Sequence, residues 1–120
     1  MEQRAWIAMA ACWGFLAVAA GAFASHGFDA AGDAHGARLM EIGARYQMWH
    51  ALAMLACLTL LPARRLPLWL WAVGSALFSL SLYALALGAP RPVAMLTPVG
   101  GTVMLLGWAA LAWCALRARP

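Results

Sequence analysis

The chain has 120 residues, of which 66% are hydrophobic and only 10% are charged. A soluble domain carries about 25% charged residues, so this composition excludes an ordinary globular domain and leaves no room for a soluble catalytic domain. The net charge of +4 does not indicate nucleic-acid binding, because the eight Arg residues lie at the edges of apolar runs rather than in one basic stripe. We therefore expect a lipid bilayer, and no nucleic acid, as the partner of this chain.

Four long runs contain no Asp, Glu, Lys or Arg. They cover residues 5–28, 46–63, 66–90 and 92–116. A transmembrane helix needs about 20 mainly apolar residues, so each run is long enough, or nearly so, to cross a membrane. The sequence predicts an all-α, integral membrane four-helix bundle that forms a single domain over residues 1–120. Its expected spans are about 5–24, 46–62, 68–87 and 93–116.

The first span carries small residues at a spacing of three or four. This strip comprises Ala10, Gly14, Ala17, Gly21 and Ser25. Small residues on one helix face let a neighbouring backbone approach closely, so we expect the strip to pack against another helix. Arg4, the apolar stretch and Ala22-Phe23-Ala24 also resemble a cleaved signal peptide, but the stretch is longer than a usual signal sequence. We expect a retained span.

The only long hydrophilic stretch, residues 25–44, connects the first two spans. Arg38, Glu41 and Arg45 follow one another at i, i+3 and i+7 and form one charged helical face. We predict a short amphipathic helix that lies on the membrane and leads into the second span. In the fourth span, either the helix starts near Val93 and kinks at Pro98, or Thr97 caps a helix that starts at Pro98.

The distribution of Arg residues predicts the orientation. Four spans place both termini and the middle turn on one side of the membrane. That side would hold five Arg residues, and the other side would hold Arg38, Arg45 and Arg91. Positive residues are enriched in cytoplasmic loops, so we expect both termini in the cytoplasm.

The chemically active side chains gather in the outer half of the predicted bundle. They are His26, Arg45, Tyr46, Gln47, His50, Tyr83 and Thr97. Polar groups inside a membrane either bind a ligand or hold helices together by hydrogen bonds, and both interpretations fit this set. Catalytic residues, a metal site and a cofactor are not expected, because the four carboxylates lie outside the spans and the three Cys are widely separated.

Four blocks of the chain resemble one family. Residues 21–28 read GAFASHGF and resemble GAFGAHGL; residues 45–52 read RYQMWHAL and resemble RYQMYHAL. Residues 79–83 read SLSLY and resemble SGSLY, and residues 97–101 with Gly107-Trp108 resemble TPIGG followed by GW. These motifs belong to the domain of unknown function 423 family, the YgdD/YwdK-like small membrane proteins. The resemblance implies a bacterial inner-membrane protein with four helices and implies no activity.

These observations favour a small multi-pass inner-membrane protein that is not an enzyme. We expect a structural or accessory role in which the polar cluster fixes helix packing, with a second copy of the chain or another membrane protein as the possible partner. The alternative is a protein that uses the cluster to bind or transport a small molecule, a lipid or an ion, in an oligomer.

Overall fold

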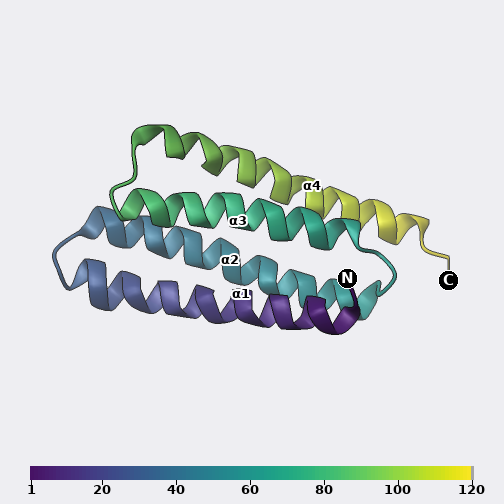
Figure 1. Cartoon of the computed structure of the whole chain (residues 1–120). Coiled ribbons are helices and arrows are strands. Elements are labelled where there is room, and N and C mark those ends of the chain that lie inside the picture. Colours follow the sequence, from purple (N-terminus) through teal and green to yellow (C-terminus); the bar gives the residue numbers. More distant parts are fainter. Residues whose placement is uncertain (120) are drawn as a thin grey trace.

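The structure, a computed structural model, describes residues 1–119 and is helical throughout apart from short connections. The elements are α1 (Gln3–Phe23), the π-helix η1 (Ala24–Asp29), α2 (Ala34–Leu60), α3 (Leu66–Ala86), the 3₁₀-helix η2 (Arg91–Met95) and α4 (Leu96–Arg117). Four long helices run antiparallel along a molecule of 54 × 26 × 20 Å (Figure 1). The predicted all-α class is confirmed.

The helices pack in chain order. The main contacts join α1 to α2, α2 to α3 and α3 to α4, so α2 lies between α1 and α3, and α4 lies on the far side of α3 (Figure 1). The N-terminus, the C-terminal end of α4 and the α2–α3 turn lie at one end of the molecule, which we call the terminal end. The connection between α1 and α2 and the turn before α4 lie at the other, which we call the loop end (Figure 1).

Three stretches of the described chain are long and apolar enough to cross a membrane. They are Gln3–Asp29, Leu66–Ala86 and Arg91–Arg117. The helix α2 is not among them, since Arg45, Gln47 and His50 make it more polar than its neighbours. Gln47 is 1% exposed and His50 is 4% exposed, so α2 turns these two polar side chains toward the other helices.

Residues 34–44 of the polar connection do not form a separate helix. The Asp33 carboxylate accepts a hydrogen bond from the Gly36 backbone N–H at 2.9 Å, which caps α2 at its first turn. From there α2 continues without a break to Leu60. The predicted amphipathic segment between the first and second spans is therefore not confirmed as an element of its own, because residues 34–44 form the first turns of α2.

Two glycines of the small-residue strip, Gly14 and Gly21, pack against α2. Ala17 is buried. A Cβ added to Gly14 would lie 3.7 Å from the Met48 sulfur, and one added to Gly21 would lie 4.0 Å from Ala44. These residues let the two helices approach closely along much of their length.

Glycines also bring α3 and α4 together. A Cβ on Gly100 would overlap the Phe78 backbone nitrogen and lie 2.7 Å from the Gly74 carbonyl oxygen. A Cβ on Gly107 would lie 2.5 Å from the Trp71 ring. The two helices therefore meet backbone to backbone at Gly100, which explains why their contact is the most extensive in the fold.

The start of α4 differs from both sequence predictions. The 3₁₀-helix η2 precedes α4, which begins at Leu96 with Met95 as its N-cap residue. Pro98 therefore lies in the first turn of α4, where its missing N–H removes no helical hydrogen bond. Neither a kink at Pro98 nor an N-cap at Thr97 is needed.

Candidate functional site

Gln47 is the centre of a buried polar network that joins three helices. Its Nε2 donates to the Trp13 backbone oxygen of α1 at 2.8 Å. Its Oε1 accepts a hydrogen bond from the Tyr83 hydroxyl of α3 at 2.7 Å. An amide offers both a donor and an acceptor, so one side chain of α2 links α1 to α3 through two interhelical bonds.

Tyr83 reaches Gln47 because α2 carries a glycine at the contact. A Cβ on Gly43 would lie 2.5 Å from the Tyr83 ring, so no larger residue fits against the present ring position. The Ser79 hydroxyl, one turn before Tyr83, donates to the Gly43 carbonyl oxygen at 2.7 Å. The α2–α3 contact is thus fixed by the close packing of Tyr83 against Gly43 and by one hydrogen bond on each side of that contact.

Serines extend the network toward the terminal end. Trp13 Nε1 of α1 donates to the Ser75 hydroxyl of α3 at 2.8 Å, and that hydroxyl donates to the Trp71 carbonyl of its own helix at 2.6 Å. Ser75 and Ser79 are both fully buried. A buried hydroxyl without a partner is costly in an apolar environment, and here each serine has one.

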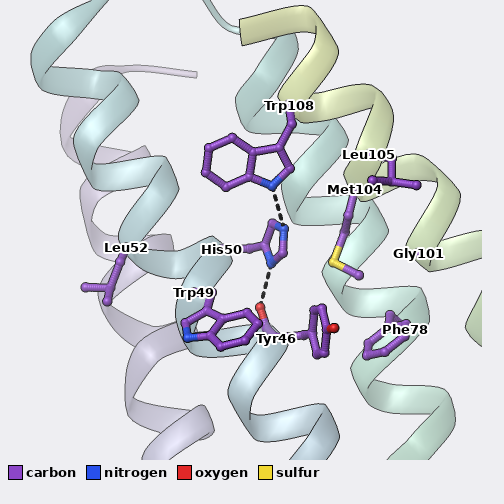
Figure 2. A pocket seen from close by; sticks show the side chains of 9 residues that line it. All are labelled: Tyr46, Trp49, His50, Leu52, Phe78, Gly101, Met104, Leu105 and Trp108. Carbon is purple, nitrogen blue, oxygen red and sulfur yellow. Dashed lines mark hydrogen bonds between the residues drawn. The ribbon is translucent and has the colours of Figure 1, made fainter. Parts of the chain in front are cut away.

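His50 joins α2 to α4, and both of its ring nitrogens are engaged. Nδ1 lies 2.6 Å from the Tyr46 carbonyl oxygen and Nε2 lies 3.1 Å from Trp108 Nε1 (Figure 2). A carbonyl can only accept and an indole N–H can only donate. The two bonds therefore require the neutral imidazole with its proton on Nδ1, which is the form expected of a structural histidine between helices.

The other predicted site residues lie apart from this network. Thr97 pairs with the Ser81 hydroxyl at 2.6 Å, which ties α3 to the start of α4. His26, in η1, and Arg45, on α2, are exposed. The structure thus brings Gln47 and Tyr83 together and sets His50 beside Tyr46, but it does not bring all seven side chains into one cluster.

Several partners in the network were not predictable from their depth in the membrane. They are Trp13, Ser75, Ser79, Ser81 and Trp108. A serine or tryptophan in an apolar helix gives no sign of the helix that it faces, so depth alone could not select them. The feature of the sequence that could have identified some of these partners is the family resemblance, whose blocks contain Ser79, Ser81 and Trp108.

An open groove lies between α2 and α4 beside His50. We call it the α2–α4 groove; its volume is about 590 Å³. It is lined by Tyr46, Trp49, His50, Leu52, Phe78, Gly101, Met104, Leu105 and Trp108 (Figure 2). The Tyr46 and Phe78 rings are in contact, with centroids 4.8 Å apart. The lining is almost wholly apolar and aromatic, so the groove suits a hydrocarbon group better than a polar solute.

No group of three His, Cys, Asp or Glu side chains within residues 1–119 is placed to hold a metal ion. The three cysteines, Cys12, Cys57 and Cys114, are free thiols.

Comparisons with known proteins agree with the pattern of motifs. The family model described as "Protein of unknown function (DUF423)" matches residues 20–101. A "UPF0382 membrane protein" of Haemophilus influenzae is 39% identical over 98% of each chain. "UPF0382 inner membrane protein YgdD" of Escherichia coli K12 is 39% identical over 98% of this chain and 93% of its own.

A more distant relative, "UPF0382 membrane protein SSP2132" of Staphylococcus saprophyticus, is 33% identical over 88% of this chain and 92% of its own. No solved structure matches this chain. The predicted family and the inner-membrane location both agree with these relatives, none of whose names indicates an enzymatic activity. The chain therefore belongs to the DUF423 family, the UPF0382 membrane proteins.

Proposed function

We propose that this protein is a non-enzymatic structural or accessory component of the bacterial inner membrane, built around a polar network that holds its four helices in one arrangement. The observation that carries the proposal is the engagement of both nitrogens of His50, by the Tyr46 carbonyl and by the Trp108 indole. A side chain whose hydrogen-bonding atoms are all used within the protein stabilises the bundle.

The alternative role, binding or transport of a ligand by the polar cluster, requires polar atoms that can change partners. Gln47 uses its amide on two other helices, and Tyr83 donates to that amide. A ligand would have to break these bonds and compensate for them inside an apolar bundle, at a cost of about 1–3 kcal/mol for each polar group left unpaired. The interhelical bonds therefore favour the structural role.

The proposal includes α2 as the fourth membrane span. This helix packs against α1 and α3, both of which belong to stretches that are long and apolar enough to cross. A helix between two spanning helices shares their depth, and its polar residues Gln47 and His50 are shielded by its neighbours. In the same arrangement, a second copy or another membrane protein would contact the lipid-facing side chains of α1 and α4.

The proposed orientation has both termini in the cytoplasm. The terminal end carries Arg4, Arg64, Arg65, Arg117 and Arg119, and the half of the molecule nearer the loop end carries the other three Arg residues. We expect a green fluorescent protein fused to the C-terminus to be fluorescent, and an alkaline phosphatase fused there to be inactive, because positive loops stay in the cytoplasm. An active phosphatase fusion without fluorescence would reverse the orientation.

His50→Ala is expected to lower stability. The change removes two hydrogen bonds and leaves the Trp108 N–H without its partner, which should cost about 2 kcal/mol and lower the thermal unfolding midpoint in detergent by about 5–10 °C. His35→Ala is the matched control, because His35 is exposed in the first turn of α2; its midpoint should equal that of the wild type. An unchanged midpoint for His50→Ala would contradict the structural role.

A further inference from the structure

The charged face of α2 leads directly into the α2–α4 groove. Arg38, Glu41, Arg45, Trp49 and Leu52 follow one another at intervals of three or four residues, so they form one strip along α2. The first three residues are exposed and charged, whereas the last two line the groove. A polar surface that continues into an apolar groove matches the shape of an amphiphilic molecule.

The groove itself offers contact to hydrocarbon and little else. The histidine in its wall, His50, has both ring nitrogens engaged, by the Tyr46 carbonyl and by the Trp108 indole. The rim residues Trp49, Leu52 and Leu105 are 51%, 55% and 70% exposed. The groove therefore opens from the bundle to its surroundings, which in a membrane are lipid chains.

Arg45 lies deeper in the bundle than the other charged residues of the strip. Ser79 bonds to Gly43, and α3 continues from Ser79 for seven more residues before it ends at Ala86. Arg45 is two residues beyond Gly43 in the opposite direction, so its Cα lies roughly 13 Å from the loop end of α3. Its side chain leans toward the N-terminus of α2, that is, toward the loop end and the head groups.

A lipid-facing arginine at this depth needs an anion. The strip itself supplies one carboxylate, Glu41, which lies between Arg38 and Arg45, so the strip keeps one net positive charge. The other three acidic residues, Glu2, Asp29 and Asp33, precede the first residue of α2. A second copy of the chain would carry its carboxylates in the same places. The bilayer, by contrast, supplies phosphate groups, which arginine binds with paired N–H donors.

We propose that the α2–α4 groove holds one acyl chain of a phospholipid whose phosphate is bound by Arg45. The acyl chain lies between Trp49 and Leu105, and the head group lies over the first turns of α2. In this arrangement the lipid covers the open side of the α2–α4 contact, where His50 and Trp108 meet. The inference is independent of the structural role proposed for Gln47 and Tyr83.

The test is native mass spectrometry of the protein released from vesicles of phosphatidylethanolamine and phosphatidylglycerol. The wild type should retain one phospholipid. Arg45→Gln should weaken retention about tenfold, through loss of a charge-assisted contact. Gly101→Leu should abolish it, because a side chain at this groove position fills the space; its Cβ would meet only Phe78, at an ordinary 3.8 Å. Ala11→Leu, on the exposed face of α1, is the control and should retain the lipid.

A second readout does not depend on the variants. Phosphatidylglycerol with a photoreactive diazirine on one acyl chain should label peptides that contain Trp49 or Leu105 in wild-type protein in vesicles. Equal lipid retention by Gly101→Leu and the wild type, or labelling spread evenly over α1 and α4, would overturn the proposal. So would a wild-type dimer that Gly101→Leu converts to a monomer, because the groove would then hold a second copy.

Discussion

Gly100→Ala is expected to destabilise the bundle strongly, although alanine forms helices better than glycine. The added Cβ would overlap the Phe78 backbone nitrogen and lie 2.7 Å from the Gly74 carbonyl oxygen. Backbone atoms of a helix cannot rotate away, so α3 and α4 must separate along their contact. Overpacking of this kind costs about 1–3 kcal/mol, and separation also weakens the His50–Trp108 bond. We expect a loss near 3 kcal/mol in the free energy of unfolding.

Gly101→Ala is the matched control, because the same methyl group is added one residue along the chain. Its Cβ would lie 3.8 Å from the Phe78 ring, which is ordinary contact. Alanine should therefore be neutral there, or stabilise α4 by up to about 1 kcal/mol through its helix propensity. The measurement is reversible unfolding of both variants in mixed micelles. Equal stabilities for the two would mean that α3 and α4 do not meet at Gly100.

This pair of glycines illustrates what the sequence could and could not predict. Two adjacent glycines in an apolar run indicate close helix packing, but nothing in the sequence distinguishes Gly100, which meets a backbone, from Gly101, which lines a groove. The class of fold was predictable, because charge-free runs about 20 residues long form membrane helices. The identity of the touching faces depends on how helices cross, which composition does not determine.

For the candidate site, the sequence likewise predicted the level of the residues along the bundle but not the direction in which each side chain points. Depth along antiparallel helices placed Gln47 and Tyr83 at one level, and the two are hydrogen-bonded. Depth also grouped His26 and Arg45 with them, yet both are exposed. Residues at one depth can point in different directions around a helix, and only the packing of α2 between α1 and α3 decides which of them face inward. The predicted amphipathic segment is not confirmed as a separate helix for another reason. A charged face does not itself end a helix, and α2 continues through these residues to Leu60.

The Gln47–Tyr83 pair provides a sharper test of the network than any single change. Gln47→Leu removes both interhelical bonds and leaves the Tyr83 hydroxyl without its partner, whereas the Trp13 carbonyl keeps the backbone hydrogen bond of its own helix. Because Gln47 is fully buried, we expect a loss of about 2–3 kcal/mol in the free energy of unfolding. Tyr83→Phe removes one hydroxyl and leaves Gln47 bonded to Trp13, so its loss should be about 1 kcal/mol.

Combining the two changes should cost less than the sum of the single losses. Once Gln47 is replaced, removal of the Tyr83 hydroxyl also removes an unpaired buried donor, and apolar groups then face each other across α2 and α3. Interhelical hydrogen bonds in membranes contribute about 0.6 kcal/mol on average and up to about 1.7 kcal/mol, so the coupling energy should lie in this range. Strictly additive losses would mean that the two side chains do not interact. A coupling of the expected size, measured by unfolding in mixed micelles, would establish that α2 and α3 are joined at this level by the polar pair itself, and not merely by the packing of Tyr83 against Gly43.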